Sequence, residues 1–219
     1  GENMNGMFSY CYSMTNLDVS SFKTNNGKNM NKMFIACREL TSLSLKQFDT
    51  KKVQAMEGLF SDCQKLEYLD ISNFDTSNVL TMEDMFHGLT NIKSLDLLNF
   101  NTEKVKTMRS MFYNTGLTSL DIYSFKTSQV TDFSNFLSNN YKLITINIKN
   151  FDFSNAEKIS NMFAKCTYLE KIELLKFNAQ RCTRMNNVFE ECNSLTSIDL
   201  SQWETSEVTH MYSMFEGCS

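Results

Sequence analysis

Apolar side chains recur along the chain at a fixed interval. A large apolar residue, in most units the Phe of a Met-Phe pair, returns every 26 residues, with a single interval of 25. This first column consists of Phe8, Phe34, Phe60, Phe86, Phe112, Leu137, Phe163, Phe189 and Phe215. A second, aromatic column consists of Phe22, Phe48, Phe74, Phe100, Phe125, Phe151, Phe177 and Trp203. Repeats of about 20–50 residues are typical of solenoids, in which each unit buries its apolar face against the next unit.

Each unit has two halves with different apolar spacing. Residues 66–74 follow the L-x-x-L-x-L spacing of a leucine-rich repeat, and their alternation predicts one short strand. The apolar positions of 76–89 follow helical spacing instead, at Val79, Met82, Met85, Phe86 and Leu89. A Thr at the start of this half, such as Thr50 or Thr76, suits a helix N-cap. The pattern predicts an α/β, leucine-rich-repeat-like solenoid of about eight 26-residue units, with a parallel strand face opposite a short-helix face.

We expect residues 1–219 to form a single repeat solenoid. Terminal units of solenoids normally carry a distinct polar outer face, and neither end of this sequence shows one. The chain is therefore interpreted as an excerpt of a longer array, or as one whose ends pair with a partner, which includes end-to-end self-association. The chain contains no proline and only 7 glycines, so its turns must be built from Asn, Asp, Ser and Thr.

Charge and motifs exclude several classes of protein. The 21 Lys and Arg residues face 25 Asp and Glu residues, which leaves a net charge of −4 and no basic stripe for nucleic acid. No apolar run approaches the roughly 18 residues of a membrane span. The two histidines, His87 and His210, lie in different columns of distant units, and no phosphate-binding or nucleophile motif occurs. We expect a protein without enzyme activity and without a cofactor.

Six cysteines share one column of the repeat. They are Cys11, Cys37, Cys63, Cys166, Cys192 and Cys218. Zinc sites need close pairs such as C-x-x-C, which this spacing does not provide. Disulfides between stacked neighbours are conceivable at about 5 Å, but a ladder points every Cβ the same way. Because Leu89, Thr115 and Asn140 fill the same column, we expect free, buried thiols, and we place Cys182 in the core.

The residue between the last two apolar positions of each strand points outward, and six of the eight are acidic. This row consists of Asp18, Ser44, Asp70, Asp96, Asp121, Asn147, Glu173 and Asp199. A calcium site is one interpretation, because hard cations bind carboxylate oxygens. The other is a solvated row softened by Lys46, Lys149 and Lys171, since neighbouring charges in water repel by only about 0.9 kcal/mol. We favour the solvated row and expect no metal.

Exposed apolar and aromatic residues are expected beside three members of this row. The candidate binding site consists of Tyr68, Asp70, Asp96, Leu98, Asp121 and Tyr123, with Leu175 further along the face. Aromatic, aliphatic and acidic side chains together are typical of a protein or glycan site, although single exposed residues of these types are common on any surface.

The repeat resembles that of a known family. The best matches are 66–86, LEYLDISNFDTSNVLTMEDMF, and 195–218, LTSIDLSQWETSEVTHMYSMFEGC. They resemble the 26-residue repeat of BspA-like surface proteins, also described as a lipoprotein-associated repeat of unknown function. The resemblance implies a leucine-rich-repeat-like fold and display at the cell surface, usually for adhesion. It implies no particular ligand.

The strand face and the resemblance together predict a non-enzymatic, extracellular adhesion module. Its partner would be a protein or glycan on a host or neighbouring cell. A structural spacer that displays another domain is the main alternative, and a calcium-dependent, lectin-like receptor is a third interpretation.

Overall fold

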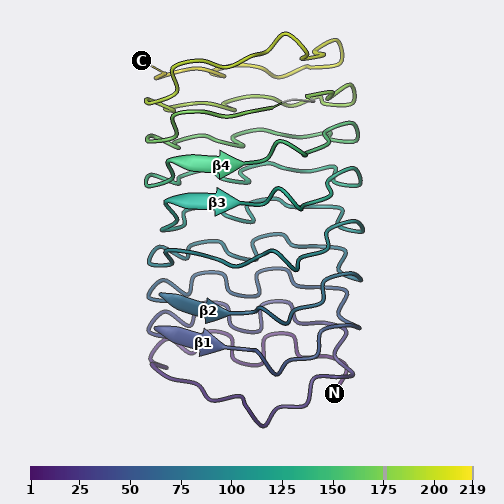
Figure 1. Cartoon of the computed structure of the whole chain (residues 1–219), viewed down its shortest axis with the longest axis vertical. Helices are drawn as coiled ribbons and strands as arrows, with labels where there is room; N and C mark the ends of the chain where they lie inside the picture. The colour runs from purple at the N-terminus through teal and green to yellow at the C-terminus, as the bar shows by residue number, and fades with distance from the viewer. Residues whose placement is uncertain (175–176, 219) are drawn as a thin grey trace.

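The chain winds into a stack of flat coils, one for each sequence unit, in this computed structural model (Figure 1). The structure describes residues 1–174 and 177–218. The two ends of the chain lie at opposite ends of the stack. The apolar columns of the sequence form one continuous core along its axis.

Parallel β-bridges run the length of the stack on one side. They join, each to the next, Asn3, Asn29, Ala55, Thr81, Thr107, Asp132, Lys158, Arg184 and His210. Consecutive members lie 26 residues apart, except for the 25 residues between Thr107 and Asp132. The bridges confirm the repeat register predicted from the apolar columns, including the position of the short unit. We call this side of the stack the turn face.

The predicted short helices are wrong, because within the described residues the turn face consists of turns and isolated bridges. In 56–63, the Leu59 N–H donates to Met56 O at 3.3 Å and the Cys63 N–H donates to Phe60 O at 3.2 Å. Each bond spans three residues and closes a β-turn, whereas an α-helix joins residues four apart. The α/β class and the short-helix face are therefore replaced by a run of overlapping turns in each unit.

The N–H groups between these turn bonds point along the stack. Gly58 N–H donates to Glu83 O at 2.8 Å and Phe60 N–H donates to Met85 O at 3.0 Å, both in the next coil. An N–H used between coils cannot also close a helical bond within its own coil. Turns and helices of this length bury apolar residues at the same spacing, so the spacing alone does not distinguish a turn segment from a short helix.

Two residues of each turn segment have positive φ, and they lie four positions apart. In the coil described above these are Gly58 at 57° and Asp62 at 58°. A type II turn requires positive φ at its third residue. Of the eighteen such residues in the described chain, eleven are Gly, Asn or Asp, the types that adopt this conformation most readily. The recurrence of Gly, Asn and Asp at these positions indicates turns, although the apolar spacing of the same segment resembles that of a helix.

The opposite side of the stack carries the predicted strands only in part. The described residues form β1 (Ser42–Ser44), β2 (Tyr68–Asp70), β3 (Ser119–Asp121) and β4 (Thr145–Asn147). β1 pairs in parallel with β2, and β3 with β4, as two separate two-stranded sheets. The strands are parallel, as predicted. The prediction of a strand in every unit is wrong, because the strand pairing is interrupted between β2 and β3 (Figure 1).

The Thr column joins coils and does not cap helices. Thr76 Oγ1 donates to Asn101 O at 2.9 Å and accepts from the Asn101 N–H at 2.8 Å, one coil further on. The same reciprocal pair is made by the buried residues Thr24, Thr50, Thr102 and Thr127. The N-cap prediction is wrong because the hydroxyl satisfies backbone groups of the neighbouring coil.

Phenylalanine rings stack along the core. Phe60 and Phe86 lie 5.9 Å apart between ring centroids, and Phe86 and Phe112 lie 5.4 Å apart, with their planes within 14° of parallel. The stack is interrupted at Leu137, where Phe136 meets Phe112 edge to face at 87°. The rings hold the coils in register through offset stacking.

The short unit depends on a glycine and a buried asparagine. A Cβ at Gly116 would lie 2.4 Å from Thr90 O, so the backbones approach too closely for a side chain. The fully buried Asn140 donates to Phe112 O at 2.7 Å and accepts from the Thr115 N–H at 3.0 Å. Its amide thus joins the shortened coil to the next one.

Replacing Phe86 with Ala should lower the free energy of unfolding by about 3–5 kcal/mol, because a fully buried ring is removed from the stack. Urea denaturation followed by circular dichroism measures the change. The exposed Leu80→Ala is the control and should change stability by less than about 0.5 kcal/mol. A small loss for Phe86→Ala would show that the aromatic stack is not a major source of stability.

Replacing Thr76 with Val should cost about 1–3 kcal/mol, because the Asn101 N–H and C=O lose their partner while the side-chain volume is retained. Thr76→Ser keeps the hydroxyl and should recover most of the loss. The same denaturation measurement applies. Equal stability of the Val and Ser variants would contradict a role for the hydroxyl between coils.

Candidate functional site

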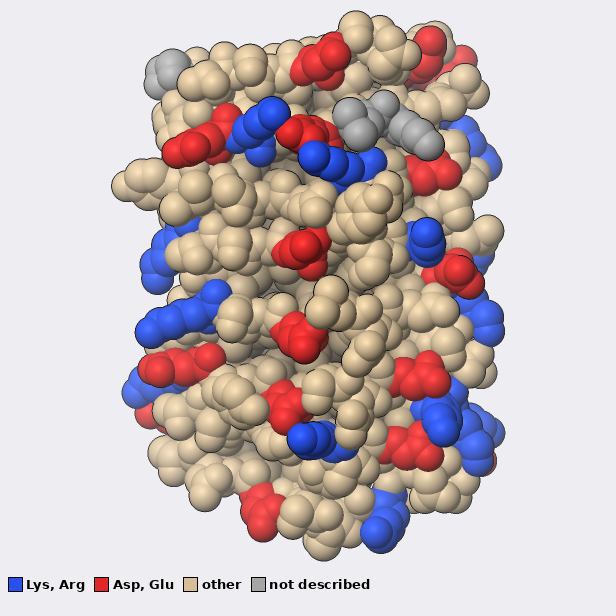
Figure 2. Space-filling model, viewed as in Figure 1, with Lys and Arg blue, Asp and Glu red and all other residues tan. Residues whose placement is uncertain are grey.

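The strand face is the outer surface of residues 42–46, 68–72, 94–98, 119–123, 145–149, 171–173 and 197–201. Three predicted site residues are prominent on it: Tyr68 is 58% exposed, Leu98 is 74% exposed and Tyr123 is 51% exposed. Acidic side chains recur along the middle of this face (Figure 2). Leu175, also predicted here, lies outside the described residues.

The site residues come from three consecutive coils but do not form one cluster. Tyr68 is the first residue of β2 and lies two positions before Asp70. It pairs with Ser42 of β1. Leu98 and Tyr123 occupy the position two residues after the acidic row, in consecutive units. The acidic row therefore separates Tyr68 from Leu98 and Tyr123, which form the more compact half of the predicted site.

The acidic row also fixes the backbone at the end of strand segments, a role that we did not predict from the sequence. In these units the aspartate Oδ1 accepts a hydrogen bond from the backbone N–H two residues later, which makes an Asx-turn at the end of the strand segment. The bonds join Ser72 to Asp70, Leu98 to Asp96 and Tyr123 to Asp121, at 3.2, 3.2 and 3.1 Å. Asp96 and Asp121 thus hold the backbone that presents the two exposed apolar side chains. In the sequence, this role is indicated by an aspartate that recurs at the same position before each bend.

Hydrogen bonds and lysines stabilise the charged form of two members of this row, Asp70 and Glu173. Bonds from the Ser72 hydroxyl and N–H lower the pKa of Asp70, and Lys46 lowers it further. Hydrogen bonds from Lys149 and Lys171 lower the pKa of Glu173 to about 2. Both lysines lie 2.6 Å from the Glu173 carboxylate. The Asp70 and Glu173 carboxylates therefore remain ionised near neutral pH, and two lysines are direct partners of Glu173.

No metal site is formed by the described residues. Within 1–174 and 177–218, no three His, Cys, Asp or Glu side chains come close enough together to hold an ion. The described residues also contain no helix of the length and hydrophobicity required to cross a membrane.

All seven cysteines lie in the described part of the chain, and each is a free thiol. Five of the six column thiols donate to a carbonyl of the preceding coil, as Cys63 Sγ does to Phe34 O at 3.1 Å. Burial raises the pKa of the Cys192 thiol to about 12, so this thiol stays protonated at neutral pH and is a poor nucleophile. Cys182 is buried in the core as predicted.

A second surface feature lies on the turn face and was not found from the sequence. A groove of about 560 Å³ runs across five consecutive coils, from Arg109 to Tyr212. Its other lining residues include Ser134, Lys158, Arg184 and Asn186. We call it the turn-face groove. The polar residues beside the bridges recur with the same period as the apolar columns, and this pattern could have indicated the groove.

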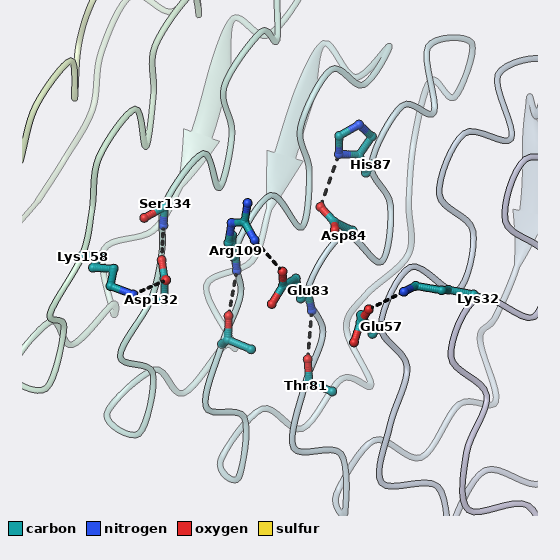
Figure 3. Close-up of polar contacts among 11 residues, drawn as sticks. Lys32, Glu57, Thr81, Glu83, Asp84, His87, Arg109, Asp132, Ser134 and Lys158 are labelled. Carbon is teal, nitrogen blue, oxygen red and sulfur yellow. Dashed lines mark hydrogen bonds and ion pairs between the residues drawn. The ribbon is translucent and has the colours of Figure 1, made fainter. Parts of the chain in front are cut away.

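Ion pairs cross from coil to coil along the turn face (Figure 3). Arg109 lies 2.9 Å from Glu83, and Lys158 lies 3.4 Å from Asp132. Arg184, by contrast, makes no ion pair with any residue in the described ranges. One cation of the groove is therefore left without a carboxylate partner.

A solved leucine-rich repeat protein from Bacteroides ovatus ATCC 8483 has a similar structure. The two structures align with a TM-score of 0.55 and 16% sequence identity, over 90% of this chain and 49% of the other. The chain thus spans about half the length of that protein. At this identity the similarity shows a leucine-rich-repeat solenoid fold and no activity.

Sequence comparison places the chain in a family. No curated protein matches it in sequence. A protein family of unknown function matches residues 1–44, 36–145 and 137–219, which together span the chain. The chain therefore belongs to the DUF285 family, described as Mycoplasma protein of unknown function.

Proposed function

We propose that this chain is a non-enzymatic binding module that recognises a protein or glycan on a host or neighbouring cell through its strand face. The observation that carries the proposal is the exposure of Tyr68, Leu98 and Tyr123 in three consecutive coils of one face. Large aromatic and aliphatic side chains are the residue types that contribute most to the centre of a binding interface.

The acidic residues support this proposal by rigidity as well as charge. Asp96 and Asp121 each accept a bond from the residue that presents an apolar side chain, so little conformational freedom is lost there on binding. Asp70 lies between Tyr68 and the next bend and carries a stabilised negative charge. A partner with a small apolar patch bordered by basic or hydroxyl groups would complement this surface.

The resemblance to BspA-like proteins supports the finer part of the proposal. Proteins of that family are usually displayed at the cell surface for adhesion, and segments 66–86 and 195–218 carry the apolar spacing of its repeat. We propose an extracellular location and an adhesive role on this basis. A spacer that displays another domain is the competing role, and a calcium-dependent receptor is the third.

Replacing Tyr68, Leu98 and Tyr123 together with Ser should weaken adhesion by about tenfold or more, because the apolar centre of the interface is lost. Adhesion is measured with beads that carry the chain and bind to cultured epithelial cells, some of them pretreated with protease or glycosidase. The pretreatment shows whether the partner is a protein or a glycan.

The matched control replaces Leu80, Tyr141 and Tyr168 with Ser, because these residues are also exposed but lie outside the strand face. It should leave adhesion unchanged. Equal adhesion of both triple variants, or no adhesion of the parent chain, would contradict the strand-face proposal and favour the spacer. Loss of adhesion on chelation of calcium would favour the lectin-like receptor.

A further inference from the structure

The turn-face groove owes its shape to residue size along one position of the repeat. The residue two places after each bridge is Arg109, Ser134, Ser160, Asn186 and Tyr212 in five consecutive coils. The three small side chains in the middle lie between two large ones, which leaves a hollow of about 560 Å³. Because the bridges keep the coils in register, the hollow is a continuous groove parallel to the stack axis.

The groove combines positive charge with uncharged hydrogen-bonding groups. Lys158 and Arg184 occupy consecutive bridge positions along it, and Arg184 has no carboxylate partner in the described chain. The Ser160 hydroxyl donates to Asn186 Oδ1 at 2.7 Å, which leaves the Asn186 amide N–H groups as donors. An unpaired guanidinium beside a positioned amide is suited to an oxyanion, because guanidinium binds such groups through two parallel hydrogen bonds.

We propose that the turn-face groove binds an acidic glycan that carries sulfate groups. Sulfate oxygens accept from Arg184 and the Asn186 amide, and sugar hydroxyls have both donors and acceptors for the polar groups between them. The exposed Tyr212 at the end of the groove offers an aromatic face to a sugar ring. This site lies on the turn face, apart from the strand face, and does not depend on the function proposed for that face.

The remaining groups of the groove favour a glycan over a uniformly anionic polymer. The Asp132 carboxylate also lines the groove, where it accepts from Lys158 at 3.4 Å and from the Ser134 N–H at 2.9 Å. A carboxylate repels an unbroken row of phosphates but accepts bonds from sugar hydroxyls. Binding of single-stranded nucleic acid normally uses several aromatic side chains for base stacking, and the lining of this groove contributes one tyrosine, Tyr212, and one histidine, His210.

The test is binding of the full chain to an immobilised heparin oligosaccharide, measured by surface plasmon resonance at about 0.15 M salt. The parent chain should bind, and Arg184→Gln should weaken binding by about tenfold or more, because a charged hydrogen-bonding group is removed. Asn186→Ala should weaken binding several-fold without any change of net charge. Thermal unfolding of each variant verifies that the fold is retained.

Arg181→Gln is the matched control, since Arg181 is exposed, pairs with Glu157 at 3.8 Å and does not line the groove. It should bind heparin as the parent chain does. An equal loss for Arg181→Gln would show attraction by overall charge and overturn the site. Absence of heparin binding by the parent chain would overturn it as well. The choice of a glycan would be overturned if polyphosphate of matched charge bound as tightly as heparin and Asn186→Ala had no effect on binding.

Discussion

Backbone hydrogen bonds between consecutive coils are the interaction on which the rest of the structure depends. On the turn face, alternate N–H groups donate to carbonyls one unit further on, as Gly58 does to Glu83 and Phe60 to Met85. The remaining N–H groups close turns inside the coil. This division satisfies the backbone of a core-facing segment without a helix. It also keeps every side-chain column in register over the described stack.

Side chains extend the same principle where backbone groups would lack partners. The Thr column bonds both the N–H and the C=O of the next coil, and the cysteine column donates to a carbonyl of the preceding coil. At the short unit, the amide of Asn140 makes the corresponding bond to Phe112 O. The cysteines and the Thr column are therefore parts of the stacking arrangement, and Asn140 takes the same role in the cysteine column.

Two faces of the stack differ in chemistry because the repeat constrains the inward positions and the bends more than the other outward positions. The strand face presents Tyr68, Leu98 and Tyr123 beside a row of carboxylates that also fix the bends. The turn face presents a polar groove lined by Arg184, which has no ion-pair partner among the described residues. Since outward residues vary from unit to unit without cost to the core, each face can acquire its own specificity.

The sequence by itself determined the period, the short unit, the core columns and the direction of the strands, because most buried positions repeat as apolar residues at a fixed interval. It also located Leu98 and Tyr123 on an exposed face. Only the tertiary structure decided that the second half of each unit is a run of turns, since turns and helices bury the same apolar spacing and differ in where their N–H groups point. The Asx-turn role of Asp96 and Asp121 and the hollow between Arg109 and Tyr212 likewise depend on the stacking of coils. Such features join residues about one unit apart, and no local pattern contains them.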